Sequence, residues 1–471
     1  MKKKALCVML SAAMVATMFT GCGSKKSSSG AGNMDAQGKD ESYKYSAAKS
    51  DDGTELNIYC WNDEFQNRVT AHYPGYEAVD ETTGKIGDLT VNWVIVANDN
   101  NAYQDNLDSV LSKNGDKQAD AAAADKIDIF LVEADYALKY VNTNYSIALS
   151  DIGVSDTDVK DQYQYTKDVV TDQNGLLKGS SWQGCPGLLF YRRDVATSVF
   201  GSDDPDTVQA KVKDWDTFVA TAGELKDAGY RVMCSANDSF RVYSNNVSSA
   251  WVSGNKVQID KNIDAWVEAS KKLVDAGYTG TADLWSDEWN AGMYMDSDVF
   301  CYFGPAWLIN FCMHKEDAGS VAAEGDWGAV VGPQGFFWGG TWVCVANGTD
   351  NADACADIVK QLTCNLDIMK EIVIDDDDFV NNQPAMEEMA NDTTYASAVL
   401  GGMNPLGLYA DGAKSIAIKY ATIYDQGCNE AFQAAMKDYF EGTVDKATAL
   451  SNFADSVKEK YPNLDVSGIT G

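Results

Sequence analysis

The sequence predicts an α/β protein that folds as two lobes. Short apolar runs alternate with segments of helical periodicity, and strands are expected at residues 56–60, 89–97 and 127–132. This β-α-β-α order implies a parallel sheet with right-handed crossovers. A chain of 471 residues is also too long for one hydrophobic core. Two packed units joined by short connections therefore suit this sequence.

The first 22 residues have the form of a lipoprotein signal peptide. Three lysines at residues 2–4 precede an apolar run over residues 5–20, which is too short to span a bilayer comfortably. The run ends at Gly21-Cys22, which resembles a bacterial lipobox, where a small residue precedes the lipid-bearing cysteine. A plain signal peptide with an incidental cysteine is the alternative. We expect an exported protein, anchored to the outer face of the cell membrane by lipid on Cys22.

Residues 23–53 follow with a different composition. They are mostly Ser, Gly, Lys and Asp, with almost no large aliphatic side chain. Such a segment cannot bury enough apolar surface to fold, so a disordered tether is predicted here.

Charge and composition exclude several kinds of function. Acidic residues outnumber basic ones by 70 to 37, which excludes nucleic acid as a partner because its binding depends on basic side chains. The two histidines of the chain predict no metal site. The sequence has no nucleophile elbow, P-loop or dinucleotide glycine pattern, so no catalytic residue or cofactor is expected. Several cysteines lie in apolar runs, where we expect buried free thiols.

Polar and aromatic side chains follow the first and third predicted strands. They are Trp61, Asn62, Asp63, Glu133 and Asp135. In open α/β sheets the ligand crevice lies beyond the carboxyl ends of the strands, so these side chains are expected to line a cleft. A ring beside amide and carboxylate groups suits a sugar, whose C–H face stacks on the ring while its hydroxyls bond to the polar groups. The alternative is that these residues turn the chain and cap the next helix.

The second half of the chain has two strand ends that carry tryptophan. One apolar run, at residues 299–303, stops at a Gly-Pro pair just before Trp307, as expected of a strand that meets a helix entrance. The other, at residues 328–331, is followed by Trp338 and Trp342. The alternative is that these rings belong to the core, as most tryptophans near strand ends do.

Two further patterns have more than one interpretation. Residues 375–378 are four aspartates in a row, but they lack the alternation and the glycine of a calcium loop, so a solvated turn is expected. Amphipathic helices are predicted at residues 215–225 and 263–274. Trp285 and Trp289 lie one helical turn apart and suit either the core or the rim of a cleft.

Four motifs, in this order, resemble the family 1 extracellular solute-binding proteins of bacterial carbohydrate ABC transporters, the maltose-binding-protein-like family. They are Tyr191-Arg192-Arg193-Asp194, Gly304-Pro305-Ala306-Trp307, Trp338-Gly339-Gly340-Thr341-Trp342 and residues 441–447. The second departs from the Gly-Pro-Trp of that family by the inserted Ala306. The resemblance implies a two-lobed periplasmic-binding-protein fold of type II, with crossing segments at a hinge and a ligand cleft between the lobes.

The resemblance also implies the limits of the lobes. One lobe is expected to comprise residues 54–182 with about 340–383, and the other residues 183–339 with about 384–471. The first hinge would lie near residues 182–186, and Trp182 would then stand at the mouth of the cleft.

The resulting hypothesis is a lipid-anchored receptor that captures a carbohydrate and delivers it to an ABC import permease. Twelve tryptophans favour an oligosaccharide. The predicted ligand-binding residues are Trp61, Asn62, Asp63, Glu133, Asp135, Trp182, Trp307, Trp338, Trp342 and Asp425. A monomer without enzyme activity, cofactor or metal is expected. Two alternatives stay open: the same fold with a polyamine or another small solute, and a surface glycoside hydrolase that uses two carboxylates.

Overall fold

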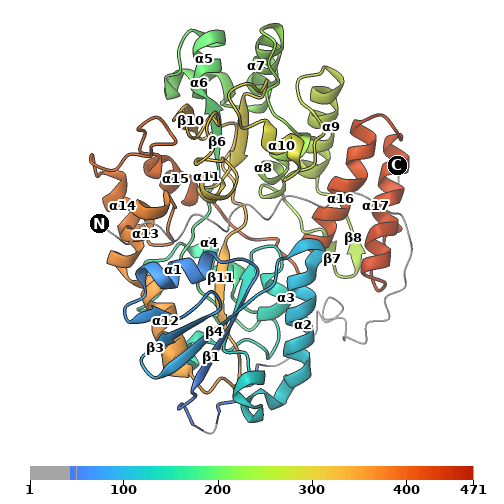
Figure 1. The fold of residues 1–471 in the computed structure, drawn as a ribbon. Coiled ribbons are helices and arrows are strands. Elements are labelled where there is room, and N and C mark those ends of the chain that lie inside the picture. The colour runs from blue at the N-terminus through green and yellow to red at the C-terminus, as the bar shows by residue number, and fades with distance from the viewer. Residues whose placement is uncertain (1–42, 49, 470–471) are drawn as a thin grey trace.

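The computed structural model describes residues 43–48 and 50–469, which form two α/β lobes, one above the other in Figure 1. The first lobe is built on a six-stranded sheet with the order β11-β5-β1-β4-β3-β2. Its strands are β1 (Glu55–Cys60), β2 (Tyr76–Ala78), β3 (Thr83–Ile86), β4 (Leu89–Ile95), β5 (Ile129–Glu133) and β11 (Thr341–Val345). β1 is parallel to β4 and β5, as the alternation of strands and helices predicted, whereas β11 is antiparallel to β5.

Helices pack against this sheet and bury its apolar strands. They are α1 (Glu64–His72), α2 (Ala102–Asn114), α3 (Ala137–Val141), α4 (Gln164–Val169), α12 (Ala352–Cys364) and α13 (Leu366–Asp376). Ile58 and Phe130 on the central strands are fully buried, and Trp93 on β4 lies in the core as predicted. The hairpin of β2 and β3 was not predicted, because each strand has only three or four residues and no apolar alternation.

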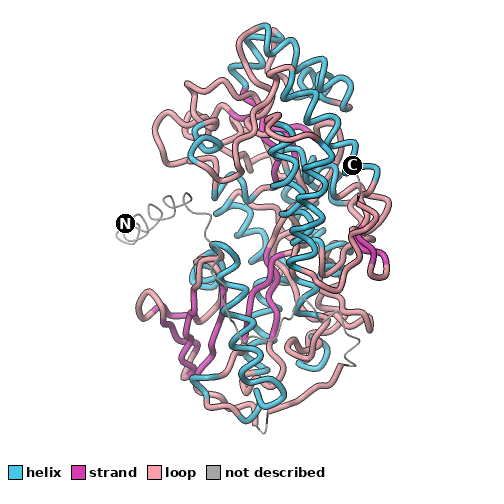
Figure 2. Tube along the Cα trace, turned by 90° about the vertical axis from the view of Figure 1, so that its right-hand side faces the viewer, coloured by secondary structure: helices cyan, strands magenta, loops and turns pink. Residues whose placement is uncertain are grey.

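The second lobe is built around a three-stranded antiparallel sheet with the order β10-β6-β9. Its strands are β6 (Leu188–Arg192), β9 (Cys301–Gly304) and β10 (Trp327–Val330), and a small hairpin joins β7 (Val252–Ser253) to β8 (Lys256–Val257). Figure 2 shows from the side that the strands of the two main sheets gather in separate halves of the molecule. The strands predicted at residues 299–303 and 328–331 correspond to β9 and β10.

Helices account for most of the rest of the chain. They are α5 (Arg193–Phe200), α6 (Pro205–Val212), α7 (Trp215–Asp227), α8 (Phe240–Ser244), α9 (Lys261–Asp275), α10 (Asp287–Ala291), α11 (Trp307–Phe311), α14 (Gln383–Ala390), α15 (Leu406–Ala413), α16 (Asp425–Phe440) and α17 (Lys446–Lys460). The predicted helices at residues 215–225 and 263–274 are α7 and α9. Helices α9, α16 and α17 share an apolar core that holds Trp266, Phe432 and Phe453.

The chain passes between the lobes in three segments, residues 180–187, 334–343 and 376–382. Isolated backbone bridges connect the segments to one another. The bridged pairs are Ser180 with Val343, Gln183 with Val380, and Pro186 with Phe337. The three crossings therefore lie side by side as one hydrogen-bonded strip.

The four aspartates at residues 375–378 do not form the solvated turn that their composition predicted. Asp378 is only 2% exposed and accepts a hydrogen bond from Gln183 Nε2 at 3.2 Å. Asp376 forms an ion pair with Arg68 on α1, with 2.8 Å between its carboxylate and the guanidinium. Asp375 and Asp376 end α13, and Asp377 and Asp378 continue into the third crossing, where neighbouring elements cover Asp378. Burial raises the pKa of Asp378 to about 6.

The segment before β1 lies against the first lobe. The predicted tether extends to Gly53, but the structure places residues 43–48 and 50–53 on this lobe with several hydrogen bonds. Tyr43 donates to Asp151 at 2.6 Å, and the Asp51 carboxylate accepts from the backbone N–H of Asp353 at the start of α12. The backbone N–H of Lys44 donates a hydrogen bond to Asn144 Oδ1 at 2.7 Å. The earlier part of the predicted tether lies outside the described residues.

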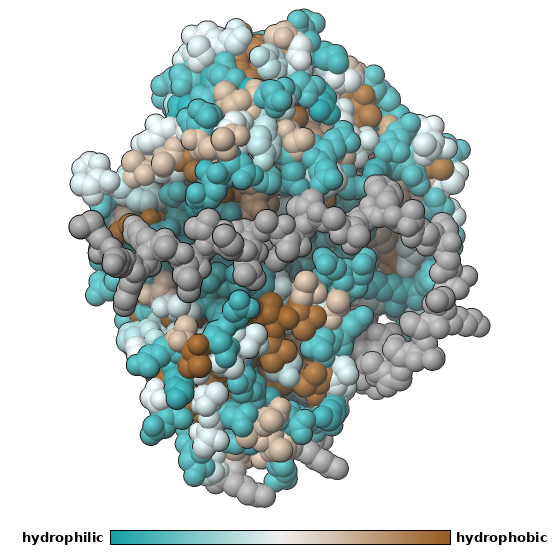
Figure 3. Space-filling view, in the orientation of Figure 1, coloured by the Kyte–Doolittle hydropathy of each residue, from teal (hydrophilic) through white to brown (hydrophobic). Residues whose placement is uncertain are grey.

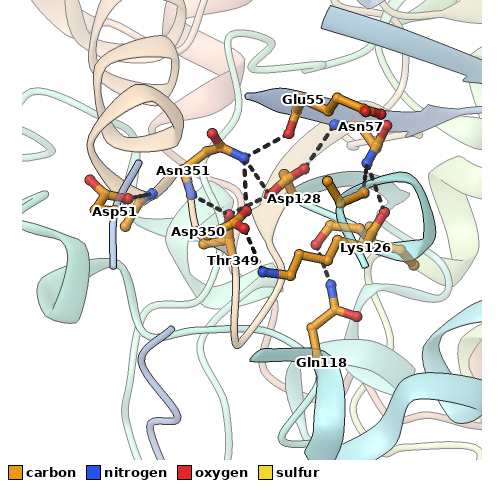
Figure 4. A network of polar contacts seen from close by, with 12 residues as sticks. Asp51, Glu55, Asn57, Gln118, Lys126, Asp128, Thr349, Asp350 and Asn351 are labelled. Carbon is orange, nitrogen blue, oxygen red and sulfur yellow. Dashed lines mark hydrogen bonds and ion pairs between the residues drawn. The ribbon is translucent and has the colours of Figure 1, made fainter. Parts of the chain in front are cut away.

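A buried polar network joins this segment and three parts of the first lobe (Figure 4). Asp128, which is fully buried, stands at its centre. Its carboxylate accepts hydrogen bonds from the backbone N–H of Asn57 at 2.8 Å, from Thr349 Oγ1 at 2.5 Å and from Asn351 Nδ2 at 3.0 Å. These donors come from β1 and from the loop after β11, so one side chain ties together the end of the sheet.

The predicted signal peptide and Cys22 lie outside the described residues. In the part of the chain that is described, no helix combines the length and the apolar character needed to cross a membrane. The nine cysteines in this part are free thiols, and all except Cys364 are buried, as predicted. The face of the molecule in Figure 3 is largely hydrophilic, in keeping with the acidic composition.

Candidate functional site between the lobes

An ion pair connects the two lobes. Asp135 follows β5 in the first lobe, and Arg241 lies on α8 in the second. The guanidinium donates two hydrogen bonds to the carboxylate, one from Nη1 to Oδ1 at 2.7 Å and a second from Nη2 to Oδ2. This two-point contact has the geometry in which arginine binds carboxylates most strongly. A polar contact between the lobes therefore lies at the carboxyl end of a central strand, where α/β proteins bind ligands.

Two more carboxyl groups surround this pair. Glu133, the last residue of β5, accepts a hydrogen bond from the backbone N–H of Asp135 at 2.8 Å. Burial raises the pKa of Glu133 well above its ordinary value, and the nearby charge of Asp135 raises it further, while Arg241 opposes both effects. Burial likewise raises the pKa of Asp425, at the start of α16, to about 7. Two carboxyl groups with raised pKa values therefore adjoin the ion pair of Asp135 and Arg241.

Four indole rings, called the tryptophan cluster below, contact one another in the second lobe, and one of them contacts Arg241. The cluster consists of Trp285, Trp289, Trp307 and Trp338. Ring centroids are 5.1 Å apart for Trp307 and Trp338 and 5.7 Å apart for Trp285 and Trp338. Trp307 Nε1 also donates to the backbone carbonyl of Trp338 at 3.1 Å. Arg241 lies over the ring of Trp338, 5.7 Å from its centroid. The cluster is thus continuous with the ion pair that joins the lobes.

The first lobe contributes rings of its own. Trp61, which follows β1, makes edge contacts with Tyr103 at 5.6 Å and with Tyr136 at 6.4 Å between centroids. Tyr136 is the residue after Asp135, so these rings adjoin the ion pair from the first lobe.

A cavity of about 460 Å³ opens beside the ion pair, and both lobes line it. Asp135 and Leu138 line it from the first lobe; Arg241, Phe337 and Asp425 line it from the second. Its volume lies in the range of small-molecule sites, and its wall mixes apolar and hydrogen-bonding side chains as such sites do. The hydroxyl of Ser244, which also lines the cavity, is buried and has no hydrogen-bond partner among the described residues. A polar ligand could satisfy this hydroxyl.

The structure brings six of the ten predicted site residues to this region. Asp135 and Asp425 line the cavity, Trp307 and Trp338 belong to the tryptophan cluster, and Glu133 and Trp61 lie next to the ion pair in the first lobe.

The other four predicted residues have different surroundings. Asn62 accepts a hydrogen bond from the backbone N–H of Glu64 at the start of α1, and Asp63 is exposed beside it. Trp182 is fully buried in the first crossing and stacks on Phe65, with 5.4 Å between centroids. Trp342 is also fully buried, and its Nε1 donates to Thr166. These two indoles belong to the buried core and do not line the cavity.

From the sequence alone, Arg241 was not identified as a site residue. The sequence also did not decide whether Trp285 lies in the core or at the rim of a cleft. Arg241 stands in the short helix α8 without any motif around it, and its partner Asp135 lies 106 positions away. No local signal could have linked the two. Among the described residues, no group of three or more His, Cys, Asp or Glu side chains is placed to hold a metal ion.

The chain matches bacterial extracellular solute-binding proteins over residues 77–400 and belongs to this family. Solved structures share its fold at low sequence identity. A family 1 extracellular solute-binding protein gives a TM-score of 0.68 at 17% identity, covering 86% of this chain and 99% of that one. An ABC transporter-associated binding protein from B. animalis subsp. lactis Bl-04, in complex with β-1,6-galactobiose, gives 0.64 at 17%, covering 87% and 98%.

The sugar-binding protein MalE from Xanthomonas citri is similar as well, with a TM-score of 0.63 at 12% identity, covering 86% of this chain and 97% of that one. At these identities the likeness establishes the two-lobed fold. No curated protein sequence matches this chain.

Proposed function

We propose that this protein is an extracellular receptor that captures a carbohydrate between its lobes and delivers it to the permease of an ABC importer. In this proposal, lipid on Cys22 holds the receptor at the outer face of the cell membrane. The lobes comprise residues 54–182 with about 340–383, and residues 183–339 with about 384–471. Membership of the extracellular solute-binding family supports export and capture of a solute.

One observation carries the choice of carbohydrate: the ion pair of Asp135 and Arg241 lies beside the tryptophan cluster, at a site lined by both lobes. Charged planar groups bind sugar hydroxyls through two-point hydrogen bonds, and indole rings bind the apolar C–H face of the sugar. Proteins of the same fold have been solved with β-1,6-galactobiose, lacto-N-biose and maltose. These likenesses support a sugar of one to a few rings for the proposed site.

Closure of the lobes follows from the same arrangement. A ligand shifts an equilibrium between open and closed forms only by its different affinity for the two forms. A sugar that contacts Asp135 in the first lobe and Trp338 in the second makes its full set of contacts only when the lobes are together. The bound, closed form is then the one that the permease receives.

A second candidate ligand is a polyamine. Glu133, Asp135 and Asp425 outnumber the single guanidinium of Arg241, and indole rings also bind cations. This candidate keeps the fold and the transport role and changes only the ligand. Catalysis is not part of the proposal, since the structural neighbours quoted above are binding proteins.

Thermal unfolding of the purified protein tests the ligand class. We expect the melting temperature to rise with at least one sugar of a panel of maltose, β-1,6-galactobiose, lacto-N-biose and tagatose. Ligand at a hundred times its Kd stabilises the folded state by about 2.7 kcal/mol, which a melting curve resolves. A shift with spermidine alone would replace carbohydrate by polyamine. Release of new reducing ends from the sugars during incubation would contradict the receptor proposal.

A further inference from the structure

Trp285 differs from every other member of the tryptophan cluster in exposure and in backbone conformation. Its side chain is 49% exposed, whereas its neighbour Trp289 is 1% exposed. Its φ is +71°, in the left-handed region that bulky residues rarely adopt. Such a conformation costs free energy and persists where the surrounding structure imposes it, most often at binding and catalytic sites.

The start of α10 imposes this conformation. The backbone N–H of Ser286 donates to the carbonyl of Asp283 at 3.1 Å, which closes a turn around Trp285. Ser286 Oγ then caps the helix by accepting from the N–H of Trp289 at 3.2 Å. Asn290 Nδ2 reaches back to the carbonyl of Trp285 at 3.2 Å. Hydrogen bonds on both sides of the residue therefore hold the backbone.

The position of the indole follows from this backbone. Its ring lies 5.1 Å from Trp289, 5.7 Å from Trp338 and 6.0 Å from Trp307, measured between centroids, so it covers the cluster from the solvent side. Trp338 in turn contacts Arg241, which binds Asp135. A continuous path of side chains thus leads from the exposed indole to the ion pair between the lobes.

We propose that Trp285 is a specificity-determining stacking residue that holds one ring of a saccharide against the second lobe. This inference rests on the proposed carbohydrate function and adds a residue to it. A structural role in the core would explain the buried indole of Trp289. It would not explain why half of the Trp285 side chain is exposed to water. A pyranose with an unsubstituted C–H face matches the flat apolar surface that the exposed indole offers. The left-handed backbone conformation of Trp285 costs free energy, and it holds the indole where a sugar can stack on it.

Four variants of the full protein test this inference, with maltose, β-1,6-galactobiose and lacto-N-biose as the sugars in calorimetric titrations. One of them, Trp289→Ala, is the reference for the loss of a buried ring. Trp285→Asn removes the ring and keeps a residue type that tolerates positive φ. We expect it to weaken binding by about tenfold or more, as truncation of an aromatic anchor does, with little change in melting temperature. Trp285→Phe keeps an aromatic surface and should retain most of the affinity. Phe311→Ala, at a ring of equal exposure on α11, is the matched control and should bind as the wild type does.

The outcomes separate this inference from the proposed function. If Trp285→Asn binds the sugars as tightly as the wild type, Trp285 is a surface residue and the inference is wrong. If its melting temperature falls as far as that of Trp289→Ala, the ring is structural and the inference is likewise wrong. If the wild-type protein binds none of the sugars, the carbohydrate function itself fails and the inference falls with it.

Discussion

Glu64→Gln is expected to stabilise the protein at pH 8 by about 4 kcal/mol and to leave its stability unchanged at pH 4. Glu64 is 7% exposed on α1, and burial raises its pKa from its ordinary value of 4.5 to about 8. Each pKa unit corresponds to about 1.4 kcal/mol of free energy. The side chain accepts a hydrogen bond from Gln183 Nε2 at 2.8 Å, which the amide oxygen of glutamine can also accept.

The direction of the pH effect follows from the raised pKa. A carboxyl group that binds its proton more tightly when folded contributes stability below pH 4.5, and this contribution is lost as the pH rises to 8. Asp378, whose pKa is raised to about 6 in the same buried group, adds to this loss. Glu64 also lies 3.6 Å from the Arg68 guanidinium, whose closer ion pair with Asp376, at 2.8 Å, does not involve Glu64. Urea unfolding at pH 4, 6 and 8 measures the effect; a constant difference between variant and wild type across this range would contradict the explanation.

Asp128→Ala is expected to lower the free energy of unfolding by about 4 kcal/mol. The change leaves three buried donors, on Asn57, Thr349 and Asn351, without the acceptor they share, and each unsatisfied buried group costs about 1–3 kcal/mol. The loss should appear as a lower urea midpoint with an unchanged dependence on urea concentration, because the native surface stays the same.

The same substitution at an exposed position of the same loop is the control. The Asp125 side chain forms a surface ion pair with Lys113, at 3.0 Å, so Asp125→Ala should change stability by less than about 0.5 kcal/mol. Equal effects of the two substitutions would show that the buried network of Figure 4 does not hold the end of the sheet together.

Local sequence patterns were sufficient to predict most of the fold. Apolar periodicity located the strands β1, β4, β5, β9 and β10, because a run of apolar residues by itself indicates a buried segment. Composition was a less reliable guide to which residues are exposed to solvent. Four consecutive aspartates looked solvated, yet Asp378 is buried, since Arg68 and Gln183 come from distant parts of the chain. Polarity alone does not reveal partners contributed by tertiary structure.

The candidate site was predictable only in part, for a related reason. A strand end fixes where a side chain such as Asp135 emerges, so its place could be inferred. The direction in which an indole points depends on the elements packed around it, which is why Trp307 and Trp338 reached the site while Trp182 and Trp342 entered the core. Arg241 had no signal of its own, because its role exists only opposite Asp135.

The three crossing segments restrict the way in which the lobes can move. Two independent linkers would allow one lobe to twist and slide as well as tilt. Here Gln183 pairs with Val380 and Pro186 with Phe337, so the connections act as a single band. We expect such a band to bend about one axis more easily than it twists, so that the proposed closure is mainly a hinge rotation. The two lobes then lose little entropy of relative orientation when a ligand brings them together. More of the free energy of the ligand contacts is therefore available as affinity.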